Sequence, residues 1–132
     1  MPEQTSFDYA VIRVVPHVER EEFVNAGVIL FCPERQFLEA RVHLDESRLK
    51  ALWPDIDLDL VRRHVQAFPD ICAGSPAAGP IAKLTQRERF HWLVAPRSTM
   101  IQVSAVHCGL CENPATTLAN LARQMLPSSA EP

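Results

Sequence analysis

Two apolar runs near the start of the chain decide the fold: Tyr9-Ala-Val-Ile-Arg-Val-Val-Pro16 and Ala26-Gly-Val-Ile-Leu-Phe-Cys32. Both are rich in β-branched and apolar residues, which predicts strands over Phe7–Val15 and Ala26–Cys32. Pro16 has no N–H for further pairing and ends the first strand. The connection is too short for a parallel crossover, so the two strands are expected to pair antiparallel.

A third strand is predicted over Phe37–Leu44, because apolar and polar residues alternate there. The apolar side carries Leu38, Ala40, Val42 and Leu44, and the polar side carries Glu39, Arg41 and His43. Such alternation is typical of a strand with one buried and one solvated face. The three strands therefore form an antiparallel meander.

Three helices are predicted from capping residues and apolar stripes. A short helix begins after Asp45 and ends at Pro54, a second begins after Asp57, and a last one begins at Asn113–Pro114. The second helix carries an apolar stripe at helical spacing, formed by Leu58, Val61, Val65 and Phe68.

The region between the second and last helices predicts a loop and two further strands. Residues 73–84 begin with many turn formers and are expected to be a flexible loop. Phe90–Ala95 and Met100–His107 are expected to pair antiparallel, and residues 127–132 to form a disordered tail. The expected fold is α+β, with an antiparallel sheet of about five strands and helices packed on one face. It forms a single domain over residues 1–132, with an ordered core over residues 7–126.

Composition limits the functional classes. The chain has 132 residues and a formal net charge of −3, which fits one domain and does not favour binding to nucleic-acid phosphates. No signal peptide or membrane span is expected from the sequence, so the protein is expected in the cytoplasm, away from membranes. There the four cysteines are expected to be reduced thiols.

The most conspicuous short motif is Cys108-Gly-Leu-Cys111. Structural zinc needs four ligands, usually from two such pairs, and only one pair is present. A redox dithiol is expected at the start of a helix, whereas the next predicted helix begins only near Asn113. The motif is interpreted as a turn with two small apolar thiols, with zinc or redox chemistry as the alternative. No metal and no cofactor are expected.

A polar cluster is the remaining candidate site. Its members are Arg13, Glu22, Asn25, Arg97 and Ser98. The hairpin end with Glu22 and Asn25 is expected to meet the turn at residues 96–98 and form a pocket for a phosphate or carboxylate, with arginine as the bidentate donor. The alternative is a structural ion pair between Arg13 and Glu22 that sets the strand register. Either interpretation predicts that these two side chains lie within salt-bridge distance.

The chain resembles a bacterial family of domains of unknown function, numbered 3037, from about Phe7 to Leu126. Three separated motifs carry the resemblance: Phe7-Asp-Tyr-Ala-Val-Ile-Arg-Val-Val-Pro16, Glu22-Phe-Val-Asn-Ala-Gly-Val-Ile-Leu30, and Phe90-His-Trp-Leu-Val-Ala-Pro-Arg-Ser98 followed by Ile101-Gln102. The resemblance implies no assigned activity. It does imply a genomic neighbour, because members are often encoded beside a HipA-like serine/threonine kinase domain.

Two functional hypotheses follow. The first is a non-catalytic partner or accessory module, with a HipA-like kinase as the candidate protein partner. The second is an enzyme or sensor that binds an anionic small ligand through Arg13, Glu22, Asn25, Arg97 and Ser98. Nucleic-acid binding is not expected, and the sequence leaves the oligomeric state open.

Overall fold

The computed structural model describes residues 3–96 and 99–126. Within them the chain forms one five-stranded antiparallel sheet and four α-helices, so the α+β class is confirmed. The strands are β1 Thr5–Val14, β2 Val24–Cys32, β3 Phe37–Val42, β4 Ile101–Val103 and β5 His107–Cys111. The helices are α1 Glu46–Leu52, α2 Leu58–Cys72, α3 Gln86–Val94 and α4 Pro114–Met125.

The sheet is built around β1, which has strand neighbours on both sides. One side pairs with β2, which pairs in turn with β3. The other side pairs with β5 along Thr5–Tyr9 and with β4 along Ile12–Val14. Strands β4 and β5 therefore share one edge of the sheet, and β3 forms the opposite edge.

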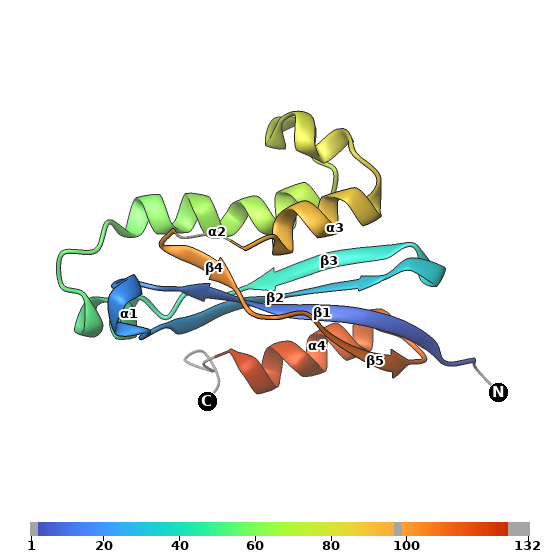
Figure 1. Ribbon diagram of the computed structural model, residues 1–132, viewed down its shortest axis with the longest axis horizontal. Helices are drawn as coiled ribbons and strands as arrows, with labels where there is room; N and C mark the ends of the chain where they lie inside the picture. Colours follow the sequence, from blue (N-terminus) through green and yellow to red (C-terminus); the bar gives the residue numbers. More distant parts are fainter. Residues whose placement is uncertain (1–2, 97–98, 127–132) are drawn as a thin grey trace.

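Helices cover both faces of the sheet (Figure 1). Helices α2 and α3 lie on one face and bury the larger core, which includes Ala10, Ile12, Val14, Ile29, Phe31, Val61, Val65, Phe68, Phe90 and Leu93. Helix α4 lies on the other face, over a smaller core of Phe7, Val28, Leu30, Cys32, Cys111 and Leu118. The expectation that all helices pack on one face was wrong, because the continuous apolar run of β2 buries alternate side chains on both faces.

The predicted helix starts are confirmed. Asp45 accepts a hydrogen bond from Arg48 N at 3.0 Å, and Asp57 accepts one from Leu60 N at 3.2 Å. Asn113 caps α4 through Ala115 N at 3.0 Å. These side chains satisfy N–H groups that a helix start otherwise leaves without partners.

The predicted strand over Phe90–Ala95 is wrong, since these residues lie in or directly after α3. Thr85 is the N-cap of this helix, and its side chain forms a capping box with Glu88. Phe90 and Leu93 then fall three residues apart on the buried face, which is helical spacing. A short apolar run fits a strand and a helix equally well, and here the capping signal upstream identifies the structure.

The single strand predicted over Met100–His107 is two strands, with a break between Val103 and His107. At the break, Ser104 Oγ accepts a hydrogen bond from Val11 N at 2.8 Å. The turn predicted at Cys108–Cys111 is strand β5. Gly109 lies against the Phe7 ring, and a Cβ atom at this position would lie 2.9 Å from Cζ of Phe7, so a larger residue would displace the ring.

Residues 73–84 contain two 3-10 turns, Pro76–Ala78 and Pro80–Lys83. The Arg89 guanidinium connects the two ends of this segment, because it donates to Cys72 O at 2.7 Å and to Leu84 O at 2.9 Å. The flexibility of this segment stays a prediction. The expected disordered tail, residues 127–132, lies outside the described residues.

Candidate functional site

Arg13 lies on the central strand, opposite Asn25 of β2 and Gln102 of β4. Its neighbours Ile12 and Val14 belong to the α2/α3 core, so the Arg13 side chain lies on the α4 face. Its guanidinium carbon is 4.1 Å from the centroid of the Phe23 ring, a cation–π contact. Its Nε atom is enclosed and has no hydrogen-bond partner in the described structure.

Glu22 is not the partner of Arg13, and that prediction is corrected. Glu22 Oε1 lies 3.8 Å from Arg20 Nη1, and both side chains are exposed. An exposed pair at this distance contributes little to stability. The residue next to Glu22, Phe23, supplies the contact with Arg13 instead.

Asn25 joins the sheet to the C-terminal end of α4. Its Nδ2 donates to Met125 O at 3.0 Å, while its Oδ1 is enclosed without a partner among the described residues. A pocket of about 320 Å³ lies beside it. The lining includes Phe23, Asn25, Arg48, Gln124 and Met125.

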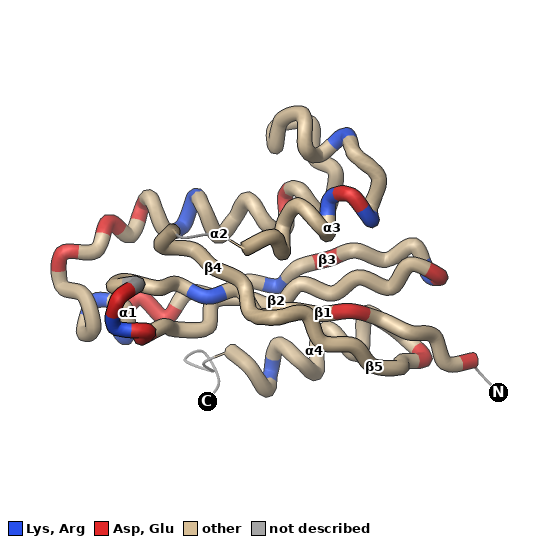
Figure 2. Tube along the Cα trace, in the orientation of Figure 1, with Lys and Arg blue, Asp and Glu red and all other residues tan. Residues whose placement is uncertain are grey.

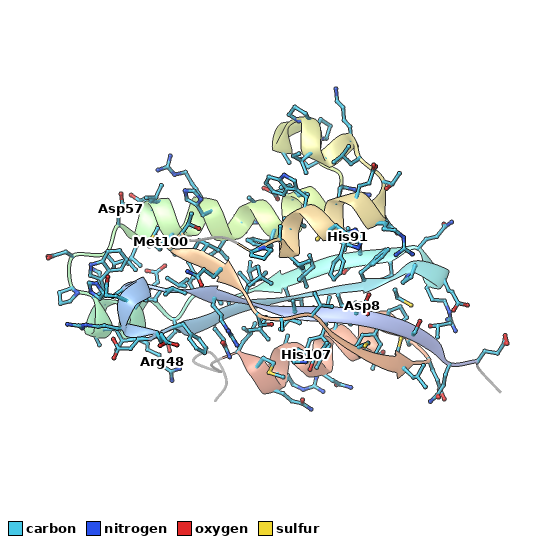
Figure 3. The ribbon with its side chains drawn as sticks, in the orientation of Figure 1. Asp8, Arg48, Asp57, His91, Met100 and His107 are labelled. Carbon is cyan, nitrogen blue, oxygen red and sulfur yellow. The ribbon has the colours of Figure 1, made fainter. Side chains whose placement is uncertain are left out.

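Arg97 and Ser98, the other two predicted site residues, lie outside the described residues. Of the predicted cluster, the structure therefore brings together Arg13 and Asn25. Sequence reasoning missed Phe23, Arg48 and Gln124. Phe23 had a signal, since it is a lone aromatic residue in a polar hairpin. Arg48 and Gln124 had none, because the fold brings them to this pocket from distant parts of the chain. Arg48, labelled in Figure 3, belongs to α1.

The two cysteines of the Cys108-Gly-Leu-Cys111 motif lie on opposite faces of strand β5. Residues three apart on a strand point to opposite faces. Cys108 is exposed, and Cys111 is buried on the α4 face. Two thiols directed to opposite sides of a sheet cannot hold one metal ion or form a disulfide with each other.

The buried cysteines lie in apolar surroundings. Thr5 Oγ1 is 3.3 Å from Cys32 Sγ and 3.9 Å from Cys111 Sγ. Burial raises the pKa of Cys111, and burial raises the pKa of Cys72 to about 12. These two thiols therefore stay protonated at neutral pH. Within residues 3–96 and 99–126, no three His, Cys, Asp or Glu side chains gather as a metal site.

The edge formed by β4 and β5 is the second candidate surface. From Met100 to Cys111 the sequence contains no Lys, Arg, Asp, Glu or Pro. Figure 2 shows the contrast with β3, which carries Glu39 and Arg41. Large apolar side chains are exposed along the uncharged edge, with Val106 43% and Leu110 64% accessible.

Some backbone N–H and C=O groups of β5 point away from β1, toward the open side of this edge. Ser104 N donates to Val11 O at 2.8 Å, and Val15 N donates to Met100 O at 2.6 Å. Because backbone groups alternate in direction along a strand, the odd-numbered residues of β1 face β4 and β5. Their partners in β5 are His107, Gly109 and Cys111. The N–H and C=O groups of Cys108 and Leu110 therefore point away from the sheet.

The fold and these surfaces define a small α+β domain, with an antiparallel sheet between helices and one uncharged edge. The family model described as "Protein of unknown function (DUF3037)" matches residues 9–126. The chain belongs to this family. Neither the curated proteins nor the solved structures gave a match.

None of the described helices has both the length and the apolar character needed to cross a membrane. The cytoplasmic location stays a prediction.

Proposed function

We propose that this protein is a non-catalytic partner module. It binds another protein when an extended segment of that partner adds as a strand to the β4–β5 edge. The open, uncharged edge is the observation that supports this proposal. An added strand would form backbone hydrogen bonds with the outward N–H and C=O groups of Cys108 and Leu110. Strand addition to an open sheet edge is a recurring mode of protein recognition.

The two edges of the sheet differ in a way that favours β5 as the binding edge. Natural proteins commonly protect edge strands with charged residues, proline or bulges, since an unprotected edge pairs with other chains. The β3 edge has such charges in Glu39 and Arg41, whereas β4 and β5 have none. When one edge of a sheet is protected and the opposite edge is not, the unprotected edge is the expected place for pairing with another protein.

The partner proposed is a HipA-like kinase, the neighbour that the family resemblance implies, in the bacterial cytoplasm. An extended segment of that kinase would lie along β5 and pack apolar side chains on Val106 and Leu110. Both side chains are exposed and would lose contact with water on binding. Because both are already partly buried, each contributes less than the roughly 1.5–3 kcal/mol gained when a fully exposed side chain becomes buried.

Co-purification of the protein with the HipA-like kinase encoded beside it tests the proposal. Leu110→Lys places a charge on the open edge, and Leu110→Pro removes an outward N–H while leaving the bonds to β1. The matched control is Glu39→Lys, an exposed substitution on the opposite edge. Thermal unfolding establishes that each variant is folded.

We expect the kinase to co-elute with the unmodified protein and with Glu39→Lys. Both Leu110 variants should weaken binding at least tenfold, which corresponds to about 1.4 kcal/mol. Failure of the unmodified protein to co-elute at micromolar concentration would contradict the proposal. An equal loss in Glu39→Lys would show that binding does not depend on the β5 edge.

A further inference from the structure

We infer that two copies of this chain associate through their β3 strands, which pair antiparallel about a two-fold axis at Ala40. In that arrangement Glu39 of each copy lies opposite Arg41 of the other. This surface is the sheet edge opposite the β4–β5 edge, so the inference does not depend on the proposed function. It is supported by the open backbone groups of β3, by the order of its two charges and by the space beside it.

β3 has a row of backbone groups with no neighbouring strand. His43 N donates to Ala26 O at 2.8 Å, which continues the pairing of β3 with β2. Because backbone groups alternate in direction along a strand, the odd-numbered residues of β3 face β2. The N–H and C=O groups of Leu38, Ala40 and Val42 therefore point to the open side, where the described chain places no other strand. These groups are available to a strand from a second molecule.

The open groups of β3 are self-complementary about Ala40. When the strand pairs antiparallel with its copy, Ala40 faces Ala40 and Leu38 faces Val42, and each of these pairs exchanges backbone hydrogen bonds. Glu39 and Arg41 then form the intervening pairs, which are not hydrogen bonded and bring the side chains closer together. The two-fold axis repeats the contact between Glu39 and Arg41, as expected when both copies use the same surface.

Glu39 and Arg41 are both exposed, and neither forms an ion pair among the described residues. Opposite charges directly across neighbouring strands stabilise the pairing, whereas like charges oppose it. The order Glu39-Ala40-Arg41 brings opposite charges together when the copies run antiparallel, while parallel strands in register would bring like charges together. These charges therefore protect the edge against unmatched strands and admit a copy of the same strand.

Space for a second strand is present beside this edge. A pocket of about 300 Å³ has Leu38 and Ala40 in its lining, and one of about 520 Å³ has Val42. Ala40 and Val42 are partly buried, and both pack against the larger core. A second strand along the edge would cover them and extend this core from one copy to the other.

The length of β3 sets the expected affinity. Stable protein interfaces bury roughly 1,200–2,000 Å². The pairing of one strand of six residues, Phe37–Val42, covers less than this. We therefore expect a dimer that dissociates at micromolar concentrations.

Sedimentation equilibrium of the full chain, from micromolar to near-millimolar concentration, tests the inference. We expect a reversible equilibrium between monomer and dimer. Glu39→Arg and Arg41→Glu each place like charges opposite one another, so each should weaken the dimer about tenfold or more. The double variant, which combines Glu39→Arg with Arg41→Glu, restores opposite charges in reversed order and should recover most of the affinity.

Glu112→Arg is the matched control, since it makes the same charge change at an exposed residue directly after β5. It should leave the dimer unchanged. Thermal unfolding establishes that each variant is folded, and if one single variant does not fold, the other decides.

The inference would be overturned by the absence of a dimer near millimolar concentration, or by a dimer that the single variants leave unchanged. A double variant as weak as the single ones, or an equal loss in Glu112→Arg, would overturn it too. The proposed function fails separately. Glu39→Arg should lose the dimer and keep the kinase, whereas Leu110→Lys should lose the kinase and keep the dimer.

Discussion

The two faces of the sheet differ in the size of their apolar cores and in the number of polar groups beside them. Helices α2 and α3 cover a large, continuous apolar core. The α4 face has a smaller core with polar groups on either side of it. Thr5, Cys32 and Cys111 lie at one end of that face, and Arg13 and Asn25 lie near the other.

A large apolar core gives most of a small domain's stability, and polar groups that lack partners reduce it. Among the described residues, Arg13 Nε and Asn25 Oδ1 on the α4 face are polar atoms of this kind. A face of this kind is where a ligand site is expected, because natural proteins depart from optimal packing at functional sites.

The largest expected effect is on the α2/α3 face. Phe68 is 2% exposed in its core, and Phe68→Ala should lower the free energy of unfolding by about 3–5 kcal/mol, since it leaves a cavity in close-packed surroundings. Urea unfolding followed by circular dichroism measures it. A cost below about 2 kcal/mol would mean that this face collapses around the cavity and is not the tightly packed one.

A smaller cost is expected for Leu118→Ala in α4. Leu118 is 1% exposed, so burial alone does not separate it from Phe68. The smaller core should relax more completely around the missing atoms, which predicts a cost of about 2–3 kcal/mol. The same unfolding experiment compares the two variants. Because phenylalanine is larger than leucine, Leu93→Ala on the α2/α3 face is the size-matched comparison, and a larger cost for Leu118→Ala than for Leu93→Ala would reverse the order of the two faces.

The smallest effect concerns the surface of the α2 side, where Arg62 Nε donates to Glu46 Oε2 at 2.8 Å. This hydrogen bond lowers the pKa of the Glu46 carboxyl below its usual value of 4.5. A lowered pKa in the folded state means that the unfolded state binds more protons as the pH falls. The stabilisation is therefore complete above pH 4.5 and is lost as the pH falls through the lowered pKa.

Unfolding of the unmodified protein and of Glu46→Gln, measured between pH 7 and pH 3, tests this effect. We expect a small difference in stability at pH 7 that shrinks on acidification. Both side chains are solvent-accessible, with Arg62 47% and Glu46 43% exposed, so the difference should be far below that of either core variant. A difference that grew as the pH fell would have the wrong sign for a lowered carboxyl pKa.

Local signals in the sequence predicted most of the elements. The alternation in residues 37–44 identified β3, and the stripe of Val61, Val65 and Phe68 identified the buried side of α2. Asp45, Asp57 and Asn113 marked the helix starts. These signals work because backbone satisfaction and side-chain periodicity depend on neighbours within a few residues.

The candidate site was predicted in part. Arg13 and Asn25 lie opposite each other, as expected of residues near one hairpin. The prediction that Glu22 is the counter-charge of Arg13 was wrong, because the adjacent residue Phe23 contacts Arg13 instead. The register shifts by one residue between Ile12 and Arg13, and such a shift changes which neighbour faces a side chain.

By itself, the sequence determined the α+β class, the meander of β1 to β3, the helix starts and the family, because short-range patterns carry that information. Only the tertiary structure decided that α4 covers the second face, that Cys108 and Cys111 point apart, and that Arg13 stacks on Phe23. Each of these depends on which distant segments lie against one another. That choice is made by the packing of the whole chain, which no local window of sequence contains.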